Sequence, residues 1–379
     1  MLEVIDLFKE SDTVDELGVG SIRDAIAEGL FPGTSVLHTR LRYVLFIPWL
    51  LQLAAHKATT DEMSAEFRKL EYRLIGSLLA GGESIGVIGN RARNNLKRMP
   101  SDIYWAALGS WGVRLSGSSA EGYFRRQLDH RRLARRTAPT DDSEARELLP
   151  GTGLDPHLPG PPQDLLKVAD FTVTAEEELY LSDVIAAATE GSMLAWLICH
   201  QPGSMTEYVW ELDNLWEAPA RLAELADHAR RFHTAIHGAA LVYNLRLARK
   251  SGRDEAVAQY EDGLLRWREE MQRTATMESW SRTGWWTSIE RLKPVRPITR
   301  QFVDRWLNLV EQDADLARSG VAADLVATRE RQIKGVRARL VNQAALDRWS
   351  GGSGLGRLDF RWTVAARHLQ DLYTARAAS

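Results

Sequence analysis

The sequence predicts a mainly α-helical fold, a multi-helix globular protein with little or no β structure. In several long segments the apolar residues recur every three or four positions, the spacing that places them on one face of a helix. The apolar–polar alternation that is typical of strands is scarce, and "ESIGVIGN" at residues 83–90 is the only short candidate. With 44% hydrophobic and 26% charged residues, the composition is that of an ordinary globular protein.

The most apolar segment, "RLRYVLFIPWLLQLAAHK" at residues 40–57, predicts a buried helix. It is uncharged over residues 43–55. A helix of that length spans only about 20 Å, well short of the ~30 Å hydrocarbon core of a membrane. Pro48 lacks a backbone N–H donor, so we expect it to kink this helix or divide it in two.

The other helices are predicted by their apolar spacing and by their start signals. Residues 221–250 carry an uninterrupted apolar stripe with steps of three or four. Thr174 followed by Glu177 has the pattern of a capping box. Pro100 begins another helix, the basic "NRARNNLKRM" before it predicts a short helix, and "YFRRQLDHRRLARR" predicts a longer one.

A proline-rich stretch suggests how the chain is divided. Six of the thirteen prolines fall within residues 139–162, a density that interrupts helices and strands. We therefore predict an N-terminal helical domain at residues 1–136 and a linker or arm at residues 137–172. A C-terminal helical domain at residues 173–379 follows.

Several classes of site are excluded by composition and motif. The single cysteine, Cys199, allows no internal disulfide and no cysteine-based zinc site, which fits a cytoplasmic protein. No phosphate-binding loop, dinucleotide fingerprint, nucleophile elbow, HExxH motif or EF-hand loop is present. The sequence therefore predicts no cofactor and assigns no catalytic residue.

The charge distribution points to a polyanionic partner. Residues 91–136 hold eleven basic and three acidic residues, a balance of +8, whereas the whole chain carries −3. Such a basic segment is typical of nucleic-acid binding through phosphates. The alternatives are a solvated helix with exposed ion pairs to Asp129, or a surface that faces another subunit. The predicted nucleic-acid-binding residues are Arg91, Arg93, Lys97, Arg98, Arg125, Arg126, Arg131, Arg132, Arg135 and Arg136.

A second cluster, at residues 280–300, combines aromatic residues with cations. Trp280, Trp285 and Trp286 lie near Arg282 in the sequence. Such residues can stack single-stranded bases or anchor a protein partner, and they can equally be packed in the core.

The only candidate metal ligands are two histidines on the long helix. His233 and His237 are four residues apart, so that their side chains share one ridge. They also adjoin the apolar stripe, where histidines are commonly hydrogen-bonded at the margin of a core. The second interpretation is favoured, and no metal is predicted.

Three blocks of the sequence resemble the bacterial domain-of-unknown-function family 6361. They are "DELGVGSIRDAIAEGLFPGTSVLHTRLRYVLFIPWL", "GVIGNRARNNLKRMPSDIYWAALGSWGVR" and "AIHGAALVYNLRLAR". The resemblance implies a bacterial cytoplasmic protein. It also implies a gene neighbourhood of helicases and phospholipase-D-like nucleases in anti-phage defence islands. It assigns no functional residue.

Together these observations predict a non-enzymatic accessory subunit of a bacterial antiviral defence system. The subunit would bind DNA non-specifically through phosphates, bind a helicase or nuclease subunit, or do both, without contact to a membrane. A purely protein-binding structural adaptor is the first alternative. A metal-dependent nuclease that uses His233 and His237 is the second.

Overall fold

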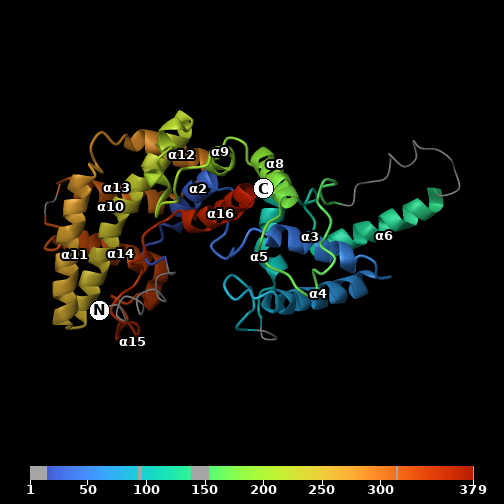
Figure 1. The fold of residues 1–379 in the computed structure, drawn as a ribbon. Coiled ribbons are helices and arrows are strands. Elements are labelled where there is room, and N and C mark those ends of the chain that lie inside the picture. Colours follow the sequence, from blue (N-terminus) through green and yellow to red (C-terminus); the bar gives the residue numbers. More distant parts are fainter. Residues whose placement is uncertain (1–14, 93–95, 138–152, 313–314, 379) are drawn as a thin grey trace. The chain divides into compact units, whose positions relative to one another are not determined.

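The computed structural model describes residues 15–92, 96–137, 153–312 and 315–378 (Figure 1). Within these ranges the chain forms α-helices and short 3-10 helices joined by turns, and it contains no strand. The strand candidate at residues 83–90 forms turns and bends instead. The prediction of a mainly α-helical fold is therefore confirmed.

The described chain divides into two compact units, each assembled from separate segments. The first unit comprises the described residues up to Leu30, together with Tyr208–Glu211 and Leu215–Phe360. The second unit comprises Phe31–Glu207, Leu212–Asn214 and the described residues from Arg361 onwards.

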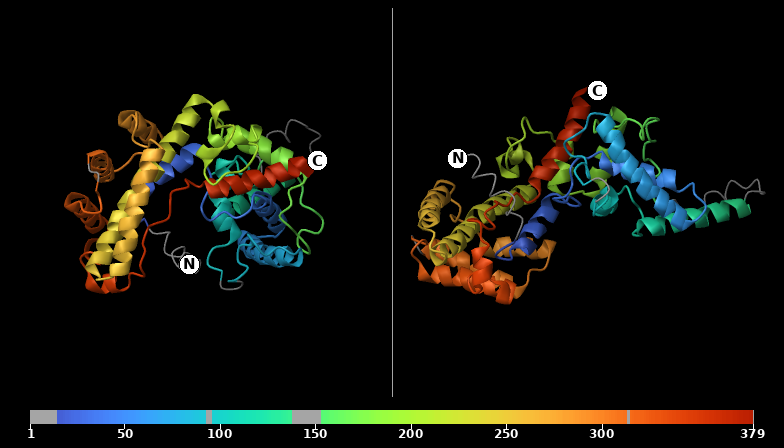
Figure 2. Two further views of the ribbon diagram at one scale, coloured as in Figure 1. Left: turned by 60° about the vertical axis from the view of Figure 1, so that its left-hand side comes forward. Right: turned by 90° about the horizontal axis from the view of Figure 1, so that it is seen from below.

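The first unit is built around two long helices, α10 (Ala220–Lys250) and α11 (Asp254–Arg273), which lie side by side in Figures 1 and 2. Helix α10 begins one residue before the predicted segment and ends where predicted, and its apolar stripe is buried. The unit also contains α2 (Gly20–Leu30), α12 (Arg282–Leu292), α13 (Pro297–Gln312), α14 (Gly320–Lys334) and α15 (Gln343–Asp347).

The second unit is built around α3 (Tyr43–Ala54), ten of whose twelve residues are buried. The predicted buried helix is therefore confirmed, and it runs through Pro48 as one continuous element. No helix of the described chain is both long and apolar enough to cross a membrane. Helices α4 (Thr60–Ala80) and α5 (Pro100–Ser110) pack against α3. The unit also contains α6 (Ala120–Thr137), α8 (Ala175–Ala188), α9 (Met193–Cys199) and α16 (Trp362–Ala378).

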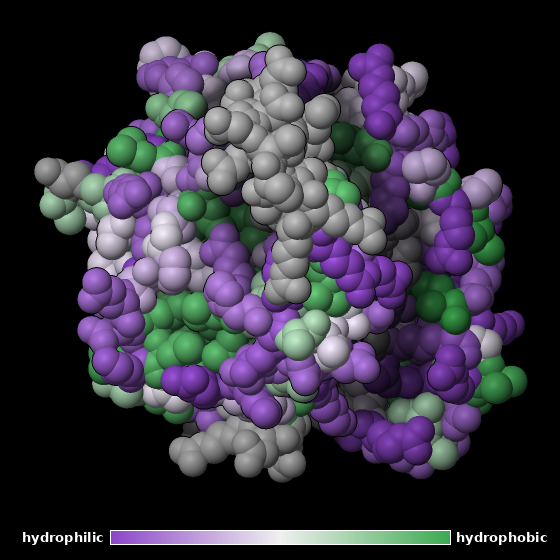
Figure 3. Space-filling model, turned by 90° about the vertical axis from the view of Figure 1, so that its right-hand side faces the viewer, coloured by the Kyte–Doolittle hydropathy of each residue, from purple (hydrophilic) through white to green (hydrophobic). Residues whose placement is uncertain are grey.

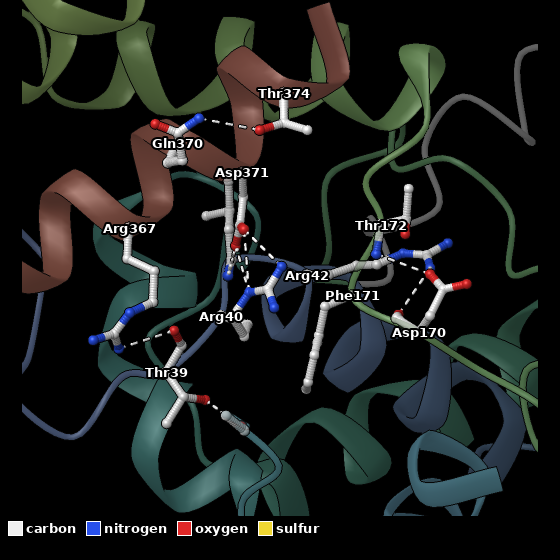
Figure 4. A network of polar contacts seen from close by, with 12 residues as sticks. Thr39, Arg40, Arg42, Asp170, Phe171, Thr172, Arg367, Gln370, Asp371 and Thr374 are labelled. Carbon is white, nitrogen blue, oxygen red and sulfur yellow. Dashed lines mark hydrogen bonds and ion pairs between the residues drawn. The ribbon is translucent and has the colours of Figure 1, made fainter. Parts of the chain in front are cut away.

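Two arginines before α3 join distant segments of the second unit (Figure 4). The guanidinium of Arg42 is buried and donates hydrogen bonds to both carboxylate oxygens of Glu177, at 3.0 and 2.8 Å. It also pairs with Asp170 at 3.0 Å. Arg40 pairs with Asp371 on α16 at 2.8 Å. Because Glu177 also closes the predicted capping box with Thr174, one carboxylate both starts α8 and holds it against α3.

The predicted division at the proline-rich stretch does not coincide with the two units. Residues 138–152 lie outside the described chain, and residues 153–172 belong to the second unit. Trp49 donates a hydrogen bond to the carbonyl of Pro159, and Ser77 donates one to the carbonyl of Leu165, each at 2.6 Å. Proline interrupts regular backbone structure, but its carbonyl remains a hydrogen-bond acceptor, so the described part of the stretch packs onto the core.

Candidate functional site

The basic segment of the second unit is organised by the packing of α6 against α4. The rings of Phe124 and Phe67 lie 6.0 Å apart, and Arg131 donates a hydrogen bond to the carbonyl of Lys57 at 2.9 Å. These two contacts show that the helices run antiparallel. Since Lys57 precedes α4, the residues of α6 after Arg131 continue past the start of that helix, and Figures 1 and 2 show α6 reaching beyond it.

The predicted arginine face of α6 forms ion pairs within the helix. Arg125 pairs with Glu121 at 2.9 Å, and Arg132 pairs with Asp129 at 3.4 Å. All four side chains are more than 60% exposed, so each pair contributes only a few tenths of a kcal/mol to the stability of the helix, ~0.3–0.5 kcal/mol. In Figure 3, which views the side to which α6 points, hydrophilic side chains cover most of the described surface.

The remaining predicted residues of α6 differ in their surroundings. Arg126 and Arg131 are half-buried, and Arg131 is held by its bond to Lys57. The side chains of Arg135 and Arg136 lie outside the described part of the structure. Of the predicted α6 cations that are described, Arg125 and Arg132 are therefore the exposed ones.

The basic turn before α5 exposes three cations. The predicted short helix is wrong for the residues described there, because residues 90–92 and 96–98 form turns and bends; Arg93 lies outside the described chain. Arg91, Lys97 and Arg98 are exposed, and no described carboxylate lies within 4.0 Å of their charged groups. These are cations that a solvent-borne anion can reach.

The base of this turn is fixed by buried polar contacts. The backbone N–H of Ser101 donates a hydrogen bond to the buried carboxyl of Glu71 at 2.9 Å, and Met99 donates one to Asp102. Burial raises the pKa of Glu71 to about 7. Behind the turn, the buried rings of Tyr104 and His38 stack at 4.2 Å. Buried hydrogen bonds and ring stacking therefore hold in place the segment that directly follows the exposed cations.

Three further exposed cations of the second unit lie on α4, outside the residues predicted from the sequence. Arg68, Lys69 and Arg73 are exposed on α4, and no described carboxylate forms an ion pair with them. They lie outside the basic segment, in a helix with four acidic and three basic residues. A helical projection of "FRKLEYR" places Arg68 and Lys69 away from the buried Phe67 and Leu70, and this pattern could have indicated that they are exposed.

The tryptophan cluster of the first unit is part of the core. Trp280, Trp285 and Trp286 are all buried, which leaves no ring face for a nucleic-acid base. The indole of Trp286 donates a hydrogen bond to Asp304 at 2.7 Å, and Arg282 pairs with Glu311 at 2.5 Å. The prediction of base stacking or partner binding is therefore corrected to core packing, because Phe232 of α10 packs against Trp285 and α13 supplies the carboxylates.

The histidine pair lines a cavity of about 80 Å³ in the first unit. The Nδ1 atom of His233 lies 2.8 Å from the carbonyl of Leu358, and its Nε2 atom lies 3.2 Å from the guanidinium of Arg357. Arg357 is paired with Glu270 at 2.5 Å. Burial, followed by the charge of Arg357, lowers the pKa of His237 to about 3.

This arrangement does not fit a metal ion. A guanidinium directed at His233 repels a cation and occupies the ring nitrogen that a metal would need. The described chain also contains no group of three or more histidine, cysteine, aspartate or glutamate side chains that could hold a metal. The interpretation of both residues as histidines at the margin of the core agrees with the geometry.

The chain belongs to a protein family described as "Family of unknown function (DUF6361)", whose model matches residues 2–376. No curated protein and no solved structure matches the chain.

Proposed function

We propose that this member of the DUF6361 family is a non-enzymatic accessory subunit that binds DNA through its phosphates. The observation that carries the proposal is the set of exposed cations on the second unit with no described carboxylate partner. They are Arg68, Lys69 and Arg73 on α4, and Arg91, Lys97 and Arg98 before α5.

The electrostatics of the segment favour a polyanion over a single acidic group. Residues 91–136 carry +8 within a chain of −3, so the positive charge is concentrated on one region. Each phosphate that such a cation neutralises releases a counterion into solution, and this release drives association. Contacts from arginine and lysine to phosphates carry no sequence information, so we expect the binding to be independent of DNA sequence.

The family resemblance implies that this subunit would act in a bacterial antiviral defence complex. A subunit that holds DNA through phosphates would keep a helicase or nuclease partner on its substrate. The fold would supply affinity, and the partner would supply catalysis.

A second function, that of a protein-binding adaptor, is favoured by the ion pairs on α6. Glu121 and Asp129 show that carboxylates bind the arginines of this face at 2.9 and 3.4 Å. An acidic partner protein could offer the same groups.

The test is a salt series with a labelled 20-base-pair duplex, measured by fluorescence anisotropy. The triple variant Arg91→Glu, Lys97→Glu and Arg98→Glu should lower the slope of log affinity against log salt by about 3, since each phosphate contact contributes about 0.9. The matched control is Arg291→Glu, Lys293→Glu and Arg296→Glu, which reverses three exposed cations of the first unit.

An unchanged slope in the control together with a reduced slope in the first variant supports the proposal. Equal losses in both variants would show that only the total charge matters. Absence of binding at 50 mM salt by the unmodified protein would leave the protein-binding adaptor as the function.

A further inference from the structure

A groove of about 420 Å³ lies in the first unit, between α10 and α14. Val242 and Leu245 of α10 and Leu316 before α14 form its buried apolar lining. Ala323 and Ala327 of α14 also line it, and their small side chains leave room above the apolar residues. The volume is of the order expected for a small-molecule site, about 300–1,000 Å³.

Four cations and no carboxylate are found among the residues that line the groove. The cations are Arg246, Arg249, Lys250 and Arg331. Arg246 pairs with Asp324 at 3.2 Å and Arg249 pairs with Glu261 at 2.6 Å, and neither acid lines the groove.

The other two cations keep hydrogen-bonding capacity. The Lys250 ammonium donates one hydrogen bond, to the carbonyl of Leu340 at 2.6 Å, and it has three hydrogen atoms to donate. Arg331 is exposed, and no described carboxylate lies within 4.0 Å of its guanidinium. The lining therefore carries two more positive charges than its described partners neutralise.

Helix dipoles do not account for the whole arrangement. Arg249 and Lys250 lie in the last turn of α10 and Arg331 lies in the last turn of α14, where cations are favourable. That effect requires neither an apolar lining nor the exclusion of carboxylates from it. A shared ligand explains why these features occur together.

We propose that this groove binds a small organic anion, with an apolar or aromatic body against α10 and α14 and an acidic head group at Arg331 and Lys250. The apolar lining makes the groove unsuited to a free inorganic ion, and its volume is too small for a helix of a partner protein. Charge and shape together therefore select an amphiphilic small molecule. The site belongs to the first unit and is independent of the DNA-binding proposal.

The first experiment is a titration of the full-length protein with 1-anilinonaphthalene-8-sulfonate, an aromatic organic anion whose fluorescence rises in apolar surroundings. We expect saturable binding at one site, and weaker binding of the uncharged N-phenyl-1-naphthylamine. Arg331→Glu should weaken binding of the sulfonate about tenfold, as expected for the loss of a charge-assisted hydrogen bond. Ala327→Trp should abolish it by filling the groove.

The control variant, Arg291→Glu, reverses an exposed cation of the same unit that does not line the groove, and it should bind the dye as the unmodified protein does. Circular dichroism shows whether each variant is folded. Wild-type binding by folded Ala327→Trp, or binding that does not saturate, would overturn the proposal. Displacement of the dye by adenosine monophosphate indicates a phosphate head group, and displacement by octanoate indicates a carboxylate; failure of both contradicts the proposal.

Discussion

Residues 91–136 of the second unit and residues 280–300 of the first unit look alike as sequence, because each combines aromatic residues with cations. In both regions the principal aromatic side chains are buried: Tyr104 and Trp111 in one, Trp285 and Trp286 in the other. In both regions some cations are exposed. The aromatic residues therefore do not distinguish a binding surface from a core.

The difference lies in the charges that surround the exposed cations. Residues 280–300 contain five basic residues and one acidic residue, a balance of +4, against +8 over residues 91–136. In the first unit Arg282 pairs with Glu311, and Arg300 pairs with Glu290. Since a polyanion responds to the summed field of a surface, the two regions should differ in DNA binding even though each exposes cations.

The largest loss of stability should come from truncating a buried tryptophan of residues 280–300. Trp285 is fully buried among Phe232, Trp280 and Trp286, so Trp285→Ala should lower the free energy of unfolding by about 3–5 kcal/mol. Denaturation by guanidinium chloride measures this loss. DNA binding by the folded fraction should be unchanged. A variant with native stability and weakened DNA binding would show that the tryptophan cluster is a binding surface and not part of the core.

The packing of the buried rings behind the basic turn can be tested through the pH dependence of stability. Burial lowers the pKa of His38, which stacks on Tyr104, to about 4, from 6.5 in the unfolded chain. The unfolded chain therefore takes up a proton below pH 6.5 while the folded protein does not. The free energy of unfolding is therefore unaffected by His38 above pH 6.5. It falls by about 3 kcal/mol as the pH is lowered towards 4.

The measurement is the free energy of unfolding at a series of pH values between 7 and 4. The variant His38→Gln should lose less stability over this range than the unmodified protein. A pH dependence that is the same with and without His38 would show that its ring is not held neutral by the fold.

Much of the local structure could be predicted from the sequence, because short-range signals determine it. The capping box at Thr174 and Glu177, the start of α5 at Pro100 and the extent of α10 all follow from spacing within a few residues. The fold class follows from the same signals.

The tertiary partners could not be predicted, because they come from distant parts of the chain. Arg42 and Glu177 are 135 residues apart, and neither differs in the sequence from an exposed charge. Arg125 and Arg98 likewise look equivalent, yet one forms an ion pair and no described carboxylate pairs with the other. Of the candidate site, the sequence could therefore indicate the basic region, but not which of its cations are available.

The smallest predicted effect concerns those ion pairs on α6. The double variant Glu121→Gln and Asp129→Asn removes the partners of Arg125 and Arg132 and raises the charge of this face by two. If these arginines contact phosphates, DNA affinity at 0.1 M salt should rise about three- to tenfold, and the salt slope should increase by up to about 2. Fluorescence anisotropy with the same labelled duplex measures both quantities.

The matched control neutralises two exposed acids of the first unit, Glu269→Gln and Glu278→Gln, and thereby changes the total charge by the same amount. A gain confined to the α6 variant would place Arg125 and Arg132 within reach of the DNA backbone. Equal gains in both variants would show that affinity follows the net charge of the chain alone. No gain in either would restrict DNA contact to α4 and the turn before α5, because the charge on α6 would then lie beyond the screening distance of about 10 Å.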